Sequence, residues 1–292
     1  MRFFDTFENR EELIRWMKDR PKGVANIHEV DGDKDIVVVI PTADFNGNYA
    51  KECREKIFKG LHIVFVESGD RDDFYFNIAH NINVGIQKAM EYNPKWIVFS
   101  GDDMHKIDEV TKLRGELNKL DHNKVGIAYP FPSSNYYSIN ESLSRIRITR
   151  FILASLSSRA NTKNFFNIKR KFDVRYVIQG KSFLSKIFYK EIIPFKDTIS
   201  LAIFNSLMLE NFYNEVGYYY DETYINCHEE SDLAIRFSRS SWEPANIQYR
   251  ILPIVGGTLG TSKMRLIRDQ CSGVYLSHKF EKQMQRDQNK EE

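Results

Sequence analysis

Short apolar runs alternate with amphipathic segments in the first half of the chain, and this alternation constrains the fold more than any other feature. The runs are continuous and rich in Val and Ile, as expected of strands that are buried on both faces. Strands are expected at residues 35–40, 61–66, 96–99 and 125–129. Helices are expected between them, at residues 47–60, 74–92 and 106–120. Such an alternation predicts an α/β fold with a mostly parallel, Rossmann-like central sheet flanked by helices.

Two adjacent carboxylates, Asp102 and Asp103, follow the third apolar run, Trp96 to Phe99. Open α/β sheets bind their ligands beyond the carboxyl ends of the strands, which is where both acids would lie. Neighbouring carboxylates repel each other, and a divalent cation held on phosphate oxygens would relieve that repulsion. Taken alone, the stretch is more simply a strand that ends in a polar turn. The two acids therefore predict a metal site only in combination with other features.

Several function classes are disfavoured by what the sequence lacks. The first expected strand is followed by Pro-Thr-Ala-Asp-Phe-Asn-Gly-Asn instead of the GxGxxG turn of NAD- or FAD-binding proteins. The three cysteines lie far apart, without the spacing of a zinc site or a disulfide framework. The N-terminus lacks an apolar signal segment, and no apolar run approaches the roughly 18 residues of a membrane-spanning helix. We expect a cytoplasmic protein, a location that allows peripheral contact with the inner face of the membrane.

A strongly basic block occupies the middle of the chain. Between Arg145 and Lys190 there are twelve Lys or Arg residues and one acid, Asp173, interleaved with aromatic and aliphatic residues. Such a block suits an anionic membrane surface, where each nearby cation contributes roughly 1 kcal/mol. A phosphate-bearing substrate or a plain solvated face would explain it too. We expect no nucleic-acid partner.

The second half carries a cluster of acids just before an expected helix. A strand is expected at 174–179, a helix at 200–216 and strands around 247–255. Asp221 and Glu222 end a Gly-Tyr-Tyr-Tyr-Asp-Glu turn, and a helix is expected soon after it, through about Arg239. Its first turn contains Glu229, Glu230 and Asp232. Acids in a first helical turn complement the helix dipole, but so many in one short stretch indicate a further role.

Taken in order, these segments resemble the inverting family-2 glycosyltransferases with the GT-A fold. The matching elements are a strand ending in Ile-Pro-Thr, a second strand ending in an acid and a Gly-Asp turn, an Asn-Val-Gly helix, the Asp-Asp pair, and Gly-Tyr-Tyr-Tyr-Asp-Glu followed by Glu-Glu-Ser-Asp-Leu-Ala-Ile-Arg. They span roughly residues 35–130 and 174–260. Each element alone is weak, and the last has the most specific pattern.

The resemblance implies a donor site for a UDP- or GDP-linked sugar. The residues that would line it are Pro41, Thr42, Glu67, Asn83, Asp102 and Asp103. Glu67 would lie beside the base or ribose, and Asp102 would face the ribose. Asp103 would coordinate Mn²⁺ or Mg²⁺ on the diphosphate, with His278 as a second metal ligand. The chain departs from the family pattern at Gly101, where many members have a further acid.

The resemblance also implies a catalytic acid and an acceptor side. Glu230 would be the general base, and Asp221, Glu229 and Asp232 would lie on the side of a carbohydrate or lipid-linked acceptor. An acceptor hydroxyl is a poor nucleophile without a base. A metal ion neutralises the charge that develops on the leaving phosphate. Direct displacement by the activated hydroxyl would invert the configuration of the sugar carbon.

These expectations divide the chain into five parts. They are an N-terminal helical extension (1–34), a nucleotide-sugar-binding half (35–132), a basic insertion (133–173), an acceptor and catalytic half (174–280) and a flexible tail (281–292). Two other functions stay open: a nucleotidyltransferase, or a non-catalytic protein that binds membrane surfaces or carbohydrate. A nucleotidyltransferase usually carries Lys or Arg in a loop after its first strand, and residues 41–50 contain neither.

Overall fold

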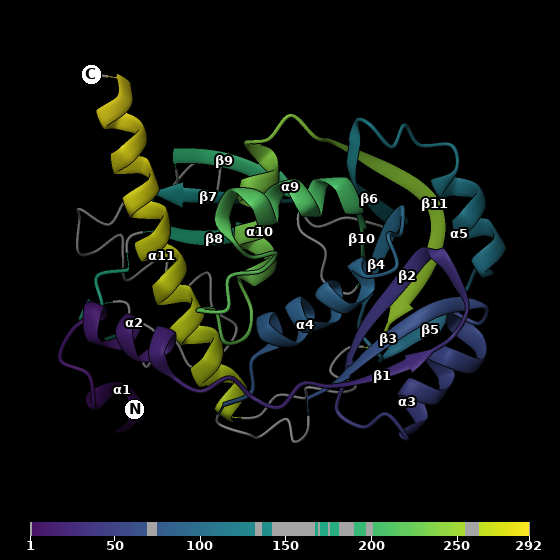
Figure 1. Ribbon diagram of the computed structural model, residues 1–292. Coiled ribbons are helices and arrows are strands. Elements are labelled where there is room, and N and C mark those ends of the chain that lie inside the picture. Colours follow the sequence, from purple (N-terminus) through teal and green to yellow (C-terminus); the bar gives the residue numbers. More distant parts are fainter. Residues whose placement is uncertain are drawn as a thin grey trace.

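The computed structural model has one large sheet with helices on both faces and a small second sheet beside the C-terminal helix (Figure 1). It describes residues 2–68, 75–131, 136–141, 167–168, 170–174, 176–180, 190–196, 201–254 and 263–291. The small sheet has the order β8 (Tyr176–Gly180), β7 (Tyr136–Glu141), β9 (Lys190–Lys196). The strand expected at 174–179 is therefore confirmed as β8. The rest of the basic block, and the glycine loop 256–260, lie largely outside the described residues.

The main sheet has eight strands with mixed pairing. Their spatial order is β1 (Asn26–Val30), β3 (Leu61–Glu67), β2 (Asp33–Thr42), β4 (Trp96–Ser100), β10 (Leu201–Asn205), β6 (Val125–Phe131), β11 (Glu243–Pro253), β5 (Met104–Lys106). β3, β2 and β4 are mutually parallel, as are β6 and β11. β1, β10 and β5 run antiparallel to their neighbours. The predicted α/β class is confirmed, whereas the pairing does not confirm a mostly parallel sheet.

The first strands are buried on both faces, as their continuous apolar runs predict. In β2, the side chains of Val38 and Ile40 join one core, and those of Val37 and Val39 join another. The first core is covered by α3 (Asn48–Glu52), the π-helix η1 (Cys53–Ile57) and α5 (Val110–Leu117). The second is covered by α4 (Ile78–Met90), α9 (Ser206–Val216) and α10 (Glu229–Ser238). Polar groups are thereby confined to the ends of these strands.

Helix α4 approaches the sheet closely because residue 85 is glycine. A β-carbon on Gly85 would lie 2.4 Å from Val39 Cγ1 and 3.0 Å from Val66 Cγ2. The side chain of Asn77 caps the helix by accepting a hydrogen bond from the His80 N–H. The first turns of α4 consequently lie beside the carboxyl ends of β2 and β3.

A third core joins the two ends of the chain. α1 (Arg2–Asp5) and α2 (Arg10–Asp19) pack against α11 (Lys263–Glu291) through buried side chains that include Leu13, Met17 and Cys271. Arg10 Nη1 also bonds Glu281 Oε2 at 2.9 Å. Helix α11 continues to Glu291, through the segment that the sequence set apart as a tail.

The single helix expected at 200–216 is wrong in its first residues, which form the central strand β10. Leu201 to Asn205 are fully buried and pair antiparallel with both β4 and β6. The helix begins only at Ser206, because the Asn205 side chain caps it by accepting from the Leu207 N–H at 2.9 Å. A short apolar run suits a strand or a buried helix equally well in sequence. Here the run forms a strand, because it pairs with both β4 and β6 in the middle of the sheet.

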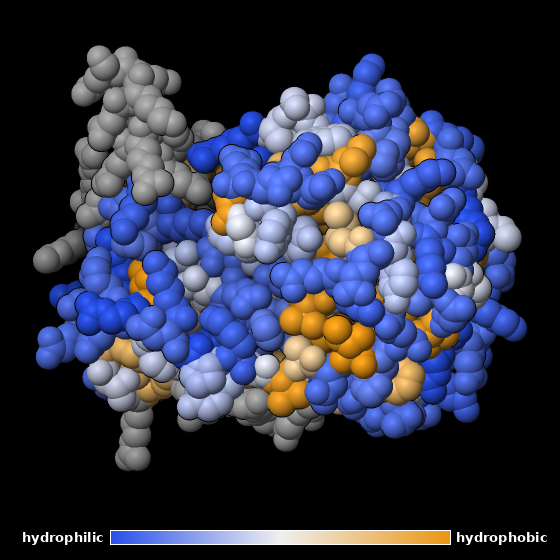
Figure 2. Space-filling view, in the orientation of Figure 1, coloured by the Kyte–Doolittle hydropathy of each residue, from blue (hydrophilic) through white to orange (hydrophobic). Residues whose placement is uncertain are grey.

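Two further strands of the main sheet, as well as β7 and β9 of the small sheet, were not predicted. Residues 26–30 form β1, which covers the outer edge of β3, and residues 104–106 form β5 against β11. The helix expected at 106–120 therefore begins at Val110. Among the helices of the described residues, none is long and apolar enough to cross a membrane. The face seen in Figure 2 is largely hydrophilic, with separate apolar patches.

Candidate functional site

The carboxyl ends of three adjacent parallel strands bring together polar side chains that are far apart in the sequence. Thr42 ends β2 and lies opposite Glu67 at the end of β3, and Asp102 follows β4. Thr42 Oγ1 donates to Asp102 Oδ2 at 2.7 Å, and both side chains are buried. Together with Asp103, these residues are called the strand-end cluster below. The half-buried Pro41 precedes Thr42 in β2, so five of the six predicted donor residues lie at one edge of the sheet.

Glu67 lies beside a flat aromatic surface that the sequence did not reveal. Its Oε2 is 2.8 Å from His28 Nε2, and its Oε1 accepts from the Phe45 N–H at 3.4 Å. The rings of His28 and Phe45 stack with centroids 4.4 Å apart, and the Arg54 guanidinium lies 4.9 Å from the Phe45 centroid. His28 belongs to the unpredicted strand β1, and only a correct pairing of β1 with β3 would have found it.

Gly101 leaves the space that the Asp103 carboxylate occupies. A β-carbon on Gly101 would lie 2.9 Å from Asp103 Oδ1, so a side chain there would displace the carboxylate. The main chain of Asp103 is fixed by the Ile254 N–H, which donates to its carbonyl at 2.7 Å. The glycine that departs from the family pattern therefore makes room for the acid beside it.

The strand-end cluster fits a divalent cation only in combination with a ligand. No group of three or more His, Cys, Asp and Glu side chains that could hold a metal ion occurs within the described residues. Mg²⁺ is commonly held by one or two carboxylates together with substrate phosphates and water. Asp103, with Asp102 beside it, supplies the hard oxygen donors that such a shared site needs.

His278 lies far from this edge. It belongs to α11, and its charged neighbours include Arg10 and Glu11 at the start of α2. Burial, and then Arg10, lower the pKa of its imidazole. Figure 1 shows α2 and α11 at one end of the molecule and β5, which follows Asp103, near the other. The structure thus does not bring the two predicted metal ligands together.

Asn83, predicted to line the donor site, instead holds the acidic turn Gly217–Glu222 against α4. Its Nδ2 donates to the Tyr220 carbonyl at 2.8 Å and to Glu222 Oε1 at 3.0 Å, and its Oδ1 accepts from the Tyr220 N–H at 2.9 Å. His80 Nδ1 lies 3.1 Å from Glu222 Oε1. Burial alone would raise the pKa of the Glu222 carboxyl, but His80 and Asn83 outweigh it and lower that pKa.

Two predicted acceptor-side acids, both buried, share one half-buried lysine from α11. Lys279 Nζ lies 2.7 Å from Asp221 Oδ2 and 2.9 Å from Asp232 Oδ1, and the Tyr275 hydroxyl donates to Asp221 Oδ2 at 2.8 Å. These four residues are called the buried ionic cluster below. Burial alone would lower the pKa of Lys279 and raise that of Asp221. Asp232 and then Asp221 outweigh burial and raise the pKa of Lys279, and Lys279 in turn lowers that of Asp221.

The predicted base lies directly after a strained turn that α11 supports. Cys227 and His228 have φ values of 63° and 70°, in the left-handed region that costs most residues about 1–3 kcal/mol. Ser272 Oγ accepts from the Ile225 N–H at 3.1 Å, and the His228 ring packs on Gly273 of the same helix. The half-buried Glu230 follows in the first turn of α10. Strain held in place by a neighbouring helix is typical of functional sites.

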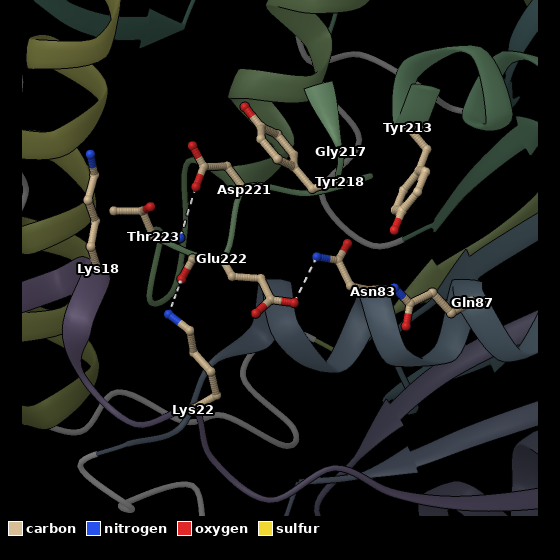
Figure 3. Close-up of a pocket in the computed structure, with 10 residues that line it drawn as sticks. All are labelled: Lys18, Lys22, Asn83, Gln87, Tyr213, Gly217, Tyr218, Asp221, Glu222 and Thr223. Atoms are coloured by element: carbon tan, nitrogen blue, oxygen red, sulfur yellow. Dashed lines mark hydrogen bonds between the residues drawn. The ribbon is translucent and has the colours of Figure 1, made fainter. Parts of the chain in front are cut away.

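A pocket of about 320 Å³ opens beside the acidic turn (Figure 3). Its lining residues come from α2 and the segment after it, from α4 and α9, and from the turn and the residue that follows it; they are Lys18, Lys22, Asn83, Gln87, Tyr213, Gly217, Tyr218, Asp221, Glu222 and Thr223. Two lysines lie on one side and two tyrosines across from them, with α4 along the floor. The sequence pointed to Asn83 and the acidic turn, but not to the lysines or Tyr213, which carry no motif.

Comparison with models of known protein families gives no match to this chain, and comparison with curated proteins gives none either. The functional conclusion therefore depends on the residues of the site. The structure brings Pro41, Thr42, Glu67, Asp102 and Asp103 to one edge of the sheet. It gathers Asp221 and Asp232 around Lys279.

Proposed function

We propose that the protein transfers a sugar from a nucleotide-diphosphate donor to an acceptor hydroxyl, as the resemblance to GT-A glycosyltransferases implies. The observation that carries this proposal is the strand-end cluster. Its polar groups stand at the carboxyl ends of three adjacent parallel strands, where ligands of open α/β sheets bind. The flat His28–Phe45 stack beside Glu67 offers a surface that suits a nucleobase.

In this proposal Asp103, together with the donor diphosphate, would hold Mn²⁺ or Mg²⁺, and the ion would supply positive charge to neutralise the leaving phosphate. Gly101 keeps the space that the Asp103 carboxylate occupies. Thr42 fixes the rotamer of Asp102 at the side of the donor by donating to its Oδ2. The chain's own contribution on this side is thus to bind and orient the donor.

Glu230 acts as the base. Its carboxylate takes the proton of the acceptor hydroxyl while the hydroxyl oxygen bonds to the sugar carbon. The bond from that carbon to the diphosphate oxygen breaks at the same time, and the nucleoside diphosphate leaves with the electron pair. Because the hydroxyl attacks from the side opposite the leaving group, the carbon is inverted. The turn at Cys227 and His228, supported by α11, holds Glu230 in one position.

Thermal unfolding with UDP and GDP, each with and without Mn²⁺, tests the donor site. A nucleotide at 100 times its Kd adds roughly 2.7 kcal/mol to the free energy of unfolding. We expect Mn²⁺-dependent stabilisation by one of the two nucleotides, loss of it in Asp103→Asn, and retention in Asp35→Asn, an exposed carboxylate near the start of β2. The absence of stabilisation with either nucleotide would refute the proposal.

Transfer or hydrolysis of the matching nucleotide sugar tests the chemistry. Glu230→Gln keeps the size of the side chain but cannot accept a proton, so turnover should fall by about 10²–10⁴-fold while nucleotide binding persists. Release of pyrophosphate instead of the nucleoside diphosphate would identify a nucleotidyltransferase. Nucleotide binding without turnover of any UDP- or GDP-sugar would favour a non-catalytic protein. Contact between residues 145–190 and an anionic membrane stays a prediction.

A further inference from the structure

We propose that the pocket between Lys18, Lys22, Tyr213 and Tyr218 binds a saccharide that carries an anionic group, and that this saccharide is the acceptor. Only the role of the saccharide as acceptor rests on the proposed function, since its binding can be measured without donor or metal. None of the strand-end cluster lines the pocket. It is therefore separate from the proposed donor site.

The charges of the pocket favour an anion, although two acids line it. The carboxylate of Asp221 is paired with Lys279, which it shares with Asp232, and that of Glu222 contacts His80 and Asn83. In the described part of the chain, by contrast, neither lysine forms an ion pair with a carboxylate. Lys22 Nζ donates to the Glu222 main-chain carbonyl at 3.2 Å. Burial and then Arg20 lower its pKa, and a bound anion would oppose this shift by favouring the charged form of the lysine.

The opposite side of the pocket suits a sugar ring. Tyr213 is 37% exposed, and aromatic faces of this kind pack well against the C–H groups of a pyranose. Tyr218 is held in place before any ligand arrives. The Arg236 guanidinium lies 5.2 Å from its ring centroid, and Lys279 Nζ lies 3.1 Å from its hydroxyl. A wall that is already ordered loses little conformational entropy on binding.

Hydroxyl-binding groups lie between these two sides. Figure 3 shows Gln87 and Asn83 along α4, with the Glu222 carboxylate and Thr223 facing the same space. The exposed Gln87 amide can donate and accept, as a ring bearing several hydroxyls requires. The anionic group would then lie at the lysines, the ring at the tyrosines and the hydroxyls at α4.

The pocket is also connected to the proposed catalytic residue. Asp221 lines it and shares Lys279 with Asp232, which lies two residues after Glu230 in α10. The same acidic turn thus forms a wall of the pocket and leads into the helix that carries the base. This continuity favours an acceptor over an unrelated ligand.

Isothermal titration of the full chain with three monosaccharides tests the inference: glucuronic acid, glucose 6-phosphate and glucose. We expect at least one anionic sugar to bind, with glucose at least about tenfold weaker because it lacks the charge-assisted hydrogen bonds. The two anionic sugars separate a carboxylate-bearing from a phosphate-bearing acceptor. Equal affinity for all three sugars, or no binding of either anion, would overturn the inference.

Variants locate the binding. The double variant Lys18→Gln/Lys22→Gln should weaken binding of the anionic sugar by about tenfold or more and leave glucose unchanged, and Tyr213→Ala should weaken binding of all sugars. Lys59→Gln is the matched control, since Lys59 is an exposed lysine lining a different pocket beside α5. An equal loss in Lys59→Gln, or none in the double variant, would refute the assignment. Sugar binding without nucleotide binding would support the assignment of the pocket and refute the proposed function. Nucleotide binding without sugar binding would support the proposed function and refute the assignment of the pocket.

Discussion

The residues of the strand-end cluster and those of the buried ionic cluster are held in place by different interactions. The strand-end cluster is built by backbone geometry: strands β2, β3 and β4 end side by side, and one side-chain hydrogen bond joins Thr42 to Asp102. The buried ionic cluster is joined mainly by contacts between side chains. Lys279 reaches across 58 residues of sequence to Asp221 and 47 to Asp232. The first cluster should therefore tolerate substitution and lose ligand affinity, and the second should lose stability.

Removing the shared lysine should have the largest effect on stability. In Lys279→Met, the buried Asp221 loses its cation while Asp232 keeps its ion pair with Arg236 at 3.5 Å, and breaking a buried pair in this way costs about 3–5 kcal/mol. Urea unfolding of the variant measures the loss. Lys282→Met, an exposed lysine one turn later in α11, is the control and should change stability by less than about 0.5 kcal/mol. Equal stability of the two variants would mean that the buried ionic cluster does not hold the fold.

The stability loss in Lys279→Met should depend on pH through the shifted pKa values of Asp221 and Lys279. The Asp221 carboxyl has a lowered pKa in the folded state, so its contribution is complete above its unfolded pKa of about 4 and is lost as the pH falls through the folded value. Lys279 has a raised pKa, so its contribution is complete below about 10 and is lost as the pH rises through the folded value. The stability difference between wild type and Lys279→Met should be constant from about pH 5 to 9 and shrink on both sides. A difference that changes near pH 7 would contradict this pairing.

Asn83→Ala tests whether Asn83 stabilises the acidic turn or belongs to the donor site. The variant removes hydrogen bonds to the main chain of Tyr220 and to the Glu222 carboxylate, and losing them should cost about 1–3 kcal/mol. Nucleotide affinity should stay within about twofold, as should that of the control Gln87→Ala, an exposed residue on the same helix. If nucleotide affinity fell with stability unchanged, Asn83 would belong to the donor site, as the sequence predicted.

Gly101→Ala should have the smallest effect on stability and a selective effect on the metal. The new β-carbon meets only the flexible Asp103 carboxylate, so the free energy of unfolding should change by less than about 1 kcal/mol. The displaced carboxylate should weaken Mn²⁺-dependent nucleotide stabilisation, while binding without Mn²⁺ is unaffected. A variant that retains the full Mn²⁺ effect would show that Asp103 does not hold the metal.

The comparison also explains which parts could be predicted from the sequence. Strands β2, β3, β4 and β6 were found because each is a continuous apolar run, and Thr42, Glu67 and Asp102 follow from where the first three runs end. Strand β1 was missed because Asn26–Val30 pairs on one edge only and lacks such a run. Strand β10 was assigned to a helix because its apolar residues continue into the apolar face of α9.

The long-range contacts of the site could not be predicted, since they depend on how elements pack. Nothing in the local sequence tells that Asn83 meets Tyr220, that His28 stacks on Phe45, or that Lys279 lies between two acids. His278 shows the converse case. A histidine one residue before Lys279 was a plausible metal ligand by type alone, and the packing of α11 on α2 placed it elsewhere.

The position of β10 has a consequence for synthesis on the ribosome. The strand fills the middle of the sheet, yet it leaves the exit tunnel about 70 residues after β6, which it must join to β4. Chains emerge at roughly 5–20 residues per second, so the facing edges of β4 and β6 stay open for several seconds. Open strand edges invite pairing with other chains. The nascent protein is therefore most exposed to misassembly in the interval between the completion of β6 and the arrival of Leu201 to Asn205.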